Sequence, residues 1–196
     1  TVTQSYTYAA GSASGTTSTR IATYESKYNG TSAAKYQYAY DAAGNITRQT
    51  NKLDNSYWAY AYDVQGELQY ATSYAANGTA SARYKYYYDA AGNLKSWQVT
   101  NDDNSQTLES HTYTYGDPDW KDLLTAFDGQ SITYDGAGNP LSYYDGSTMK
   151  WTEGRRLQSV TKGGKTTTYQ YDASGQRTRK TNPDGSYTKY CVVDGR

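Results

Sequence analysis

One short motif, Tyr-Asp followed by two variable residues and Gly, recurs along the chain and limits what the chain can fold into. The sequence YDAAGNI at residues 40–46 returns as YDAAGNL at residues 88–94, and looser copies begin at Tyr62, Tyr134 and Tyr171. A repeated motif indicates one structural unit used several times along the chain. The motif positions are Tyr40, Asp41, Gly44, Tyr62, Asp63, Gly66, Tyr88, Asp89, Gly92, Tyr134, Asp135, Gly138, Tyr171, Asp172 and Gly175.

Each copy reads as the end of a strand followed by a tight turn. Alternating tyrosines precede the motif, as in Tyr84, Tyr86 and Tyr88, and a period of two places side chains on one face of a strand. In the turn, Asp can accept hydrogen bonds from the backbone ahead of it, and Gly can adopt the left-handed conformation that closes a hairpin. The pattern therefore predicts a positive φ at four glycines, namely Gly44, Gly92, Gly138 and Gly175.

A second family of short turn signals alternates with the first, so that a turn recurs every ~9–14 residues. These signals are Asn29-Gly30, Asp54-Asn55, Asn77-Gly78, Asp103-Asn104, Asp128-Gly129, Asp145-Gly146, Gly163-Gly164 and Asp184-Gly185. We therefore predict an all-β fold, a continuous antiparallel meander of roughly fifteen short strands. A flat ribbon of that many strands would be ~70 Å wide, and twisted sheets rarely exceed ~10 strands without curling. We expect the ribbon to curl into a spiral, shell-like sheet with both edges open to further strands.

At most one short helix is expected, over Asp117–Phe127. Asp117 is a suitable N-cap, and Pro118 suits the first helical position. The residues from Trp120 to Phe127 have a composition compatible with one or two helical turns.

The composition assigns the core to tyrosine. Leu, Ile, Val and Phe together number 18, roughly 9% of the chain, where less than ~20% normally indicates disorder. The zero net charge and the 25 Tyr and 4 Trp residues oppose disorder, because each such ring can bury ~150–250 Å². If the chain folds, its core is expected to be tyrosine.

The motif residues resemble the YD-repeat, or Rhs-repeat, family, whose signature is Tyr-Asp-x-x-Gly followed by Asn or Arg and an aliphatic residue. The later segments 120–124, 132–135, 138–143, 154–157 and 190–195 are similar to the stretch just upstream of the Rhs-associated core in secreted Gram-positive wall-associated proteins. Together with the helical candidate, this divides the expected repeat array into regular repeats over 1–114, a helical insertion over 115–127 and pre-core repeats over 128–196. With no visible signal peptide and Thr at position 1, we interpret the sequence as an excerpt of a longer protein.

The resemblance also implies a function. Relatives wind such hairpins into a hollow shell that encloses or presents a C-terminal toxin, and in teneurins a related shell serves cell adhesion. The first hypothesis is accordingly a non-enzymatic structural segment of such a shell, in a secreted, cell-surface or cell-wall-associated protein. Its partners would be neighbouring YD repeats and an encapsulated C-terminal toxin. The alternative is a cell-surface adhesin or carbohydrate-binding repeat array.

Catalytic and metal chemistry find little support in the residues. No obvious nucleophile and orienting acid converge on His111 in sequence, and its parity with Tyr113 and Tyr115 predicts a place in an aromatic row. Cys191 is expected to be a buried, inert thiol in a strand. The repeated Asp residues share one turn position, which indicates local backbone bonding. We expect no enzyme activity, no cofactor and no metal, and the balanced charge argues against nucleic-acid binding. No apolar run approaches the ~20 residues of a membrane span.

Sugar binding is the one ligand class with some support, because Tyr and Trp present flat apolar faces with a polar edge. Most rings are assigned to core packing. The rings outside the regular alternation are the candidate platform for a cell-surface carbohydrate, and these are Tyr57, Trp58, Tyr143, Tyr144 and Trp151.

Overall fold

The computed structural model describes residues 1–11, 14–101, 103 and 105–191, and the chain divides into two compact units. Unit 1 is Thr1–His111 and unit 2 is Thr112–Arg196. Strand is the only regular structure of the described residues, which contain no helix. Accordingly, none of these residues belongs to a helix long and apolar enough to cross a membrane.

Nine strands begin in unit 1, and the unit boundary falls inside the last of them. They are β1 (Val2–Ala10), β2 (Thr17–Tyr28), β3 (Thr31–Tyr40), β4 (Ile46–Asn51), β5 (Tyr57–Tyr62), β6 (Leu68–Tyr74), β7 (Ala80–Tyr88), β8 (Leu94–Thr100) and β9 (Thr107–Thr114).

Unit 2 continues with shorter strands. They are β10 (Ala126–Phe127), β11 (Gln130–Ser131), β12 (Thr133–Tyr134), β13 (Pro140–Ser142), β14 (Thr148–Thr152), β15 (Arg156–Lys162), β16 (Lys165–Tyr171), β17 (Arg177–Thr181) and β18 (Tyr187–Lys189).

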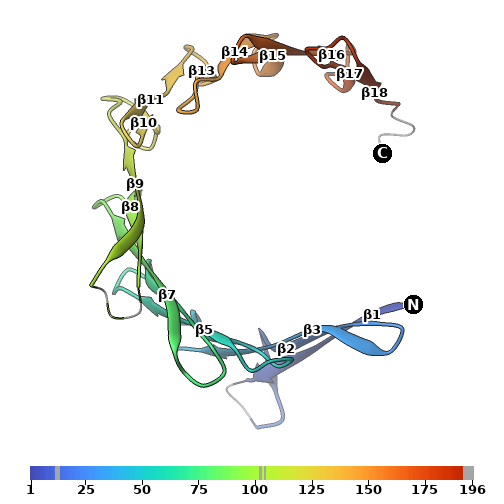
Figure 1. The fold of residues 1–196 in the computed structure, drawn as a ribbon. Coiled ribbons are helices and arrows are strands. Elements are labelled where there is room, and N and C mark those ends of the chain that lie inside the picture. The colour runs from blue at the N-terminus through green and yellow to red at the C-terminus, as the bar shows by residue number, and fades with distance from the viewer. Residues whose placement is uncertain (12–13, 102, 104, 192–196) are drawn as a thin grey trace. The chain divides into compact units, whose positions relative to one another are not determined.

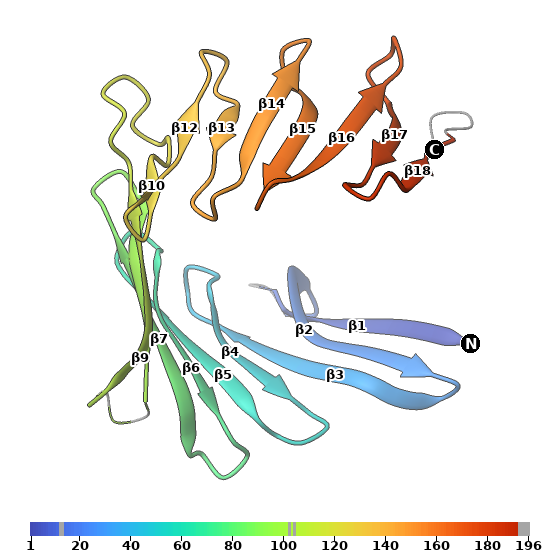
Figure 2. The same cartoon turned by 45° about the horizontal axis from the view of Figure 1, so that its top comes forward.

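Within each sheet, strands that are neighbours in sequence pair with one another, and their pairings are antiparallel (Figures 1 and 2). The strand order runs without a crossover from β1 to β11 in one sheet and from β12 to β18 in the other. The predicted all-β hairpin meander is confirmed. The described residues form eighteen strands rather than about fifteen. Three of these, β10, β11 and β12, are only two residues long and account for the difference.

The helix predicted over Asp117–Phe127 is wrong. Asp117 does act as a cap, since its Oδ1 accepts hydrogen bonds from the backbone N–H groups of Asp119 and Trp120 at 2.9 and 2.7 Å. Only a single turn follows, closed by the Leu123 N–H and the Trp120 carbonyl at 3.0 Å. The next backbone groups then join the sheet, because the Thr125 N–H donates to the Thr114 carbonyl at 2.7 Å. Pairing with β9 thus outcompetes a helix too short to be stable alone.

Cross-strand register gives unit 1 two chemically different faces. Tyr60 on β5 lies opposite Ala71 on β6, which lies opposite Tyr84 on β7 and then Val99 on β8. We call this side the tyrosine face. Ring contacts join its rows, including Trp58 with Tyr84 at 5.7 Å between centroids.

The expectation of a tyrosine core needs correction. The buried hydrophobic residues are Ala71, Val99 and Ile132, and no tyrosine among the described residues is buried. The motif tyrosines are half-buried, whereas Tyr28 retains 63% of its exposure. Neighbouring rows of a sheet cover the flanks of a ring but leave its outer end uncovered. The aromatic face is therefore a partly open surface.

Prediction for the turn glycines. The positive φ predicted at Gly44, Gly92, Gly138 and Gly175 is confirmed, with values between 79° and 100°. Gly66 (φ 85°) and Gly136, which lacks a positive φ, both have open space where a Cβ would stand. Replacing Gly66 with Ala should therefore cost ~1–2 kcal/mol of unfolding free energy through backbone strain alone.

The matched variant Gly136→Ala should be neutral or slightly stabilising, because Ala restricts the unfolded chain. Urea denaturation of both variants is the measurement. Equal midpoints for the two would contradict the strain argument.

Candidate functional site

The repeated motif forms the same turn in all five copies. In the copy at residues 88–94, the Asp89 N–H donates to the Asn93 carbonyl at 2.9 Å, and the Gly92 N–H donates to the Asp89 carbonyl at 3.1 Å. The ladder shifts register at Tyr88, which pairs with Leu94. This is a tight turn closed by a left-handed Gly and a β-bulge, a combination that joins antiparallel strands. Equivalent bonds and shifts occur at Asp41, Asp63, Asp135 and Asp172.

The Asp carboxylate holds the turn from inside. In the copy at residue 135, Oδ1 accepts the N–H groups of Ala137 and Asn139, both at 2.9 Å, and Oδ2 accepts the Asn139 side-chain amide at 2.9 Å. These bonds, chiefly from the Asn139 side chain and backbone, lower the pKa of Asp135 below its ordinary value. The pKa of Asp89 is lowered in the same way by Asn93. Carboxylates already engaged by local donors are poorly suited to acid–base or metal chemistry.

The motif tyrosine joins its hairpin to the preceding one. On this side the β4–β5 ladder ends at the pair of Arg48 with Ala59. Two residues further, the Ile46 carbonyl accepts a 2.9 Å hydrogen bond from the Tyr62 hydroxyl. A backbone carbonyl past the end of a ladder needs another partner, and the tyrosine provides it.

The same bond recurs along the chain, and Trp151 makes it with its indole N–H. The bonds run from Tyr40 to Ile21 (2.7 Å), Tyr62 to Ile46 (2.9 Å), Tyr88 to Leu68 (3.0 Å), Tyr134 to Leu124 (2.7 Å), Trp151 to Pro140 (2.7 Å) and Tyr171 to Leu157 (3.0 Å). We call this bond the tyrosine lock. It is formed between successive hairpins in both units.

A second contact between hairpins covers several of the turn glycines. A Cβ added to Gly44 or Gly175 would lie 2.6 Å from the guanidinium of Arg20 or Arg156, respectively. At Gly138 the nearest atom belongs to the Trp120 ring, at 2.7 Å. The positive φ is what requires Gly at these positions, and a Cβ there would also displace the covering side chain. Sequence reasoning missed these covering residues, because their types differ from copy to copy.

One copy departs from the others at Glu67. This residue occupies the position at which Asn45, Asn93 and Asn139 donate an amide to the motif Asp. Partial burial raises the pKa of Glu67, and the hydrogen bond with Asp63 and the negative charges of Asp63 and Asp89 raise it further. The ionised carboxylate is thus disfavoured in the fold.

The proposed ligand platform is not one surface. Tyr57 and Trp58 are adjacent on β5 and so lie on opposite faces of the sheet, and both are half-buried, as is Trp151. Tyr143 and Tyr144 are exposed at 39% and 40%, and their ring centroids lie 4.6 Å apart. Tyr144 also contacts Phe127 at 4.6 Å.

His111 lies in the aromatic row, as its parity predicts, 4.7 Å from Trp97 between ring centroids. Its Nε2 also lies 2.9 Å from a Glu109 carboxylate oxygen. The described residues bring together no group of three His, Cys, Asp or Glu side chains able to hold a metal ion.

The expectation for Cys191 is wrong. Its thiol is exposed, because the residue follows the end of β18 at Lys189 and lies outside any strand.

Prediction for the tyrosine lock. Tyr62→Phe removes only the hydroxyl that binds the Ile46 carbonyl, so it should cost ~0.5–1.5 kcal/mol of unfolding free energy. Tyr60 is the matched control, since it lies on the same strand and face and its hydroxyl has no hydrogen bond to the described residues. Urea denaturation should show a loss for Tyr62→Phe and almost none for Tyr60→Phe. Equal losses would mean that the hydroxyl bond is not what joins the hairpins.

Prediction for Glu67. A carboxyl whose pKa is raised by folding destabilises the fold while it is ionised, and this penalty disappears as the pH falls below its unfolded pKa of ~4.3. Glu67→Asn should therefore raise the denaturation midpoint at pH 7, and the gain should vanish toward pH 4. The reciprocal change Asn93→Glu should lower the midpoint at pH 7. A gain for Glu67→Asn that is independent of pH would rule out the charge as its cause.

Comparison with known proteins identifies similar repeats and similar folds. The RHS repeat model matches residues 40–80 and 151–187, one stretch in each unit. No curated protein matches the chain.

Solved structures match most of the chain. A TcdB2–TccC3 crystal structure without the hypervariable C-terminal region gives a TM-score of 0.68 at 18% identity, covering 92% of this chain. The Photorhabdus luminescens Tc holotoxin pore gives 0.64 at 19% identity and the same coverage. The chain spans 10% of the length of each matched chain. At such identities the likeness concerns the fold. The predicted resemblance to the YD-repeat, or Rhs-repeat, family is thus confirmed, on RHS repeats in both units and on a fold similar to that of Tc toxin proteins.

Proposed function

We propose that the chain is a non-enzymatic structural segment of an Rhs-type shell, which encloses or presents a C-terminal domain such as a toxin. The observation that carries this proposal is the tyrosine lock. It joins a hairpin to the one before it. The hydroxyl of the motif tyrosine is therefore engaged in holding the array together. A motif used in this way serves the continuity of a wall rather than a reaction.

Two further observations support a structural role. The motif carboxylates are occupied by their own turns, so they do not converge on a substrate. The first structures matched in fold belong to Tc toxin assemblies, one of them described as lacking a hypervariable C-terminal region. By analogy with those assemblies, we place the protein outside the cell, secreted or attached to the surface or wall, with neighbouring YD repeats as partners at its sheet edges.

A second function, a carbohydrate-binding adhesin, is favoured by one observation. Tyr143 and Tyr144 form an exposed aromatic pair in unit 2, and exposed aromatic faces are what sugar stacking requires. A glycan array probed with the chain and with Tyr144→Ala tests this function. Glycan binding that this variant loses, without a change in stability, supports the adhesin.

Prediction for the shell. The test uses the complete gene product that contains these repeats. Limited trypsin digestion should leave any C-terminal domain intact in that product, and deletion of residues 1–196 should make the domain sensitive, because the wall would be open. As a control, His111→Ala should leave protection unchanged. The proposal fails if the product has no accompanying domain, or if the deletion leaves the cleavage pattern unaltered.

A further inference from the structure

The face of unit 1 opposite the tyrosine face is cationic. Six side chains define what we call the cationic face, namely Lys27, Lys35, Arg48, Lys52, Arg83 and Lys85. Glu25 lies on the same face, and its carboxylate is 3.5 Å from both Lys27 and Lys35. Among the described residues, no carboxylate lies within ion-pair distance of Arg48 or Lys52. The face thus carries excess positive charge on a chain whose net charge is zero.

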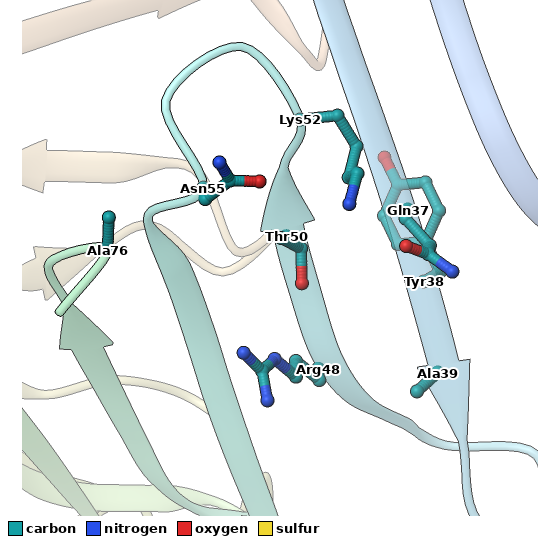
Figure 3. Close-up of a pocket in the computed structure, with 8 residues that line it drawn as sticks. All are labelled: Gln37, Tyr38, Ala39, Arg48, Thr50, Lys52, Asn55 and Ala76. Atoms are coloured by element: carbon teal, nitrogen blue, oxygen red, sulfur yellow. The ribbon is translucent and has the colours of Figure 1, made fainter. Parts of the chain in front are cut away.

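A groove of about 390 Å³ opens on this face over β3 and β4 (Figure 3). Arg48, Thr50 and Lys52 line it from β4 and the residue after its end, and Gln37 lines it from β3. Gln37 and Thr50 are cross-strand partners, as are Ala39 and Arg48. The groove therefore offers two cations separated by amide and hydroxyl groups.

Tyr57 lies beside this groove, and both faces of its ring are covered by other side chains. The Arg48 guanidinium carbon lies 3.6 Å from the Tyr57 ring centroid, and Arg48 reaches the ring from β4. From β6, Tyr74 stacks on Tyr57 at 4.6 Å with an interplanar angle of 12°. A sugar ring or a nucleotide base needs a free aromatic face, and Tyr57 has none to offer.

The stacking has a second consequence, because it holds the guanidinium plane while leaving its N–H edge open. A planar guanidinium edge matches the two oxygens of a carboxylate. Consecutive residues of a strand rise ~3.3 Å each, so the backbone positions of Arg48 and of Lys52, one residue past the end of β4, lie at most ~13 Å apart. An extended peptide has the same rise, and two of its acidic side chains four residues apart would meet both cations.

We propose that this groove binds an extended polypeptide segment rich in Asp and Glu. Its carboxylates pair with Arg48 and Lys52, and its peptide groups bond to Gln37 and Thr50. Charge complementarity selects an acidic partner, and the occupied ring favours a polypeptide over a glycan or a nucleic acid. The site does not depend on the proposed shell function, since it lies within unit 1.

The experiment measures binding of a fluorescent peptide to the full 196-residue chain at low salt. The probe alternates Glu and Thr, and its control alternates Gln and Thr. The Glu peptide should bind saturably and more weakly as salt rises, whereas the Gln peptide should not bind. Arg48→Gln and Lys52→Gln should each weaken binding about fivefold or more, because each removes a charge-assisted contact. Lys165→Gln, which removes an exposed lysine in unit 2, should leave affinity within about twofold.

Folding is checked separately, because Arg48 also packs on Tyr57. Lys52 has no cation–π contact with a ring of the described residues, so the denaturation midpoint of Lys52→Gln should match that of the unsubstituted chain. The proposal is overturned if the Glu peptide does not bind, or if Lys52→Gln binds it normally. Tighter binding of a polyuronate or an oligothymidylate through Arg48 and Lys52 would equally overturn it, because the occupant would then belong to another class.

Discussion

The hydrogen bond from a motif tyrosine to a carbonyl of the preceding hairpin is the interaction on which the structure depends. At the edge that carries the Asp-x-x-Gly turns, the ladder between successive hairpins stops before the strands do, as after Arg48 and Ala59. An unpaired carbonyl at such a place would cost free energy if it were buried. The Tyr62 hydroxyl reaches the Ile46 carbonyl instead, and the same solution recurs in both units.

This interaction explains the order of residues in the motif. The bulge before Asp turns the tyrosine ring toward the neighbouring hairpin, and Asp and Gly then close the turn within a few residues. The residue after Gly completes the turn, usually with an amide that binds the motif carboxylate. Each position thus serves either its own turn or the contact with the next repeat. A repeat of this kind has little to hold it in isolation, which is the common condition of repeat proteins.

The two faces of the unit 1 sheet carry different kinds of side chain, aromatic on one and cationic on the other. Half-buried rings fill one face, on which few residues are buried, so much of the aromatic surface stays accessible. The other face gathers cations around stacked tyrosines, with Arg48 resting on Tyr57. The first face suits the continuity of a wall, and the second suits recognition of an acidic partner. Both follow from period two, which sends alternate residues of each strand to opposite sides.

Local rules were sufficient to predict much of this fold from the sequence. The alternation of tyrosines indicated strands, and the Asp-x-x-Gly spacing indicated turns with a left-handed Gly, because both depend on a few adjacent residues. The same reasoning failed at residues 117–127, where a helix was outcompeted by pairing with β9, in which the Thr125 N–H donates to the Thr114 carbonyl.

The sequence by itself therefore determined the strands, the turns and the role of Asp within each turn. Only the tertiary structure decided what the tyrosines contact, how deeply they are buried and which residues cover Gly44 and Gly138. It also decided that Arg48 lies against Tyr57 and that Lys52 shares its groove. The physical reason is that these contacts join different strands. They depend on the register between hairpins and on where each ladder ends, and no short stretch of sequence specifies either.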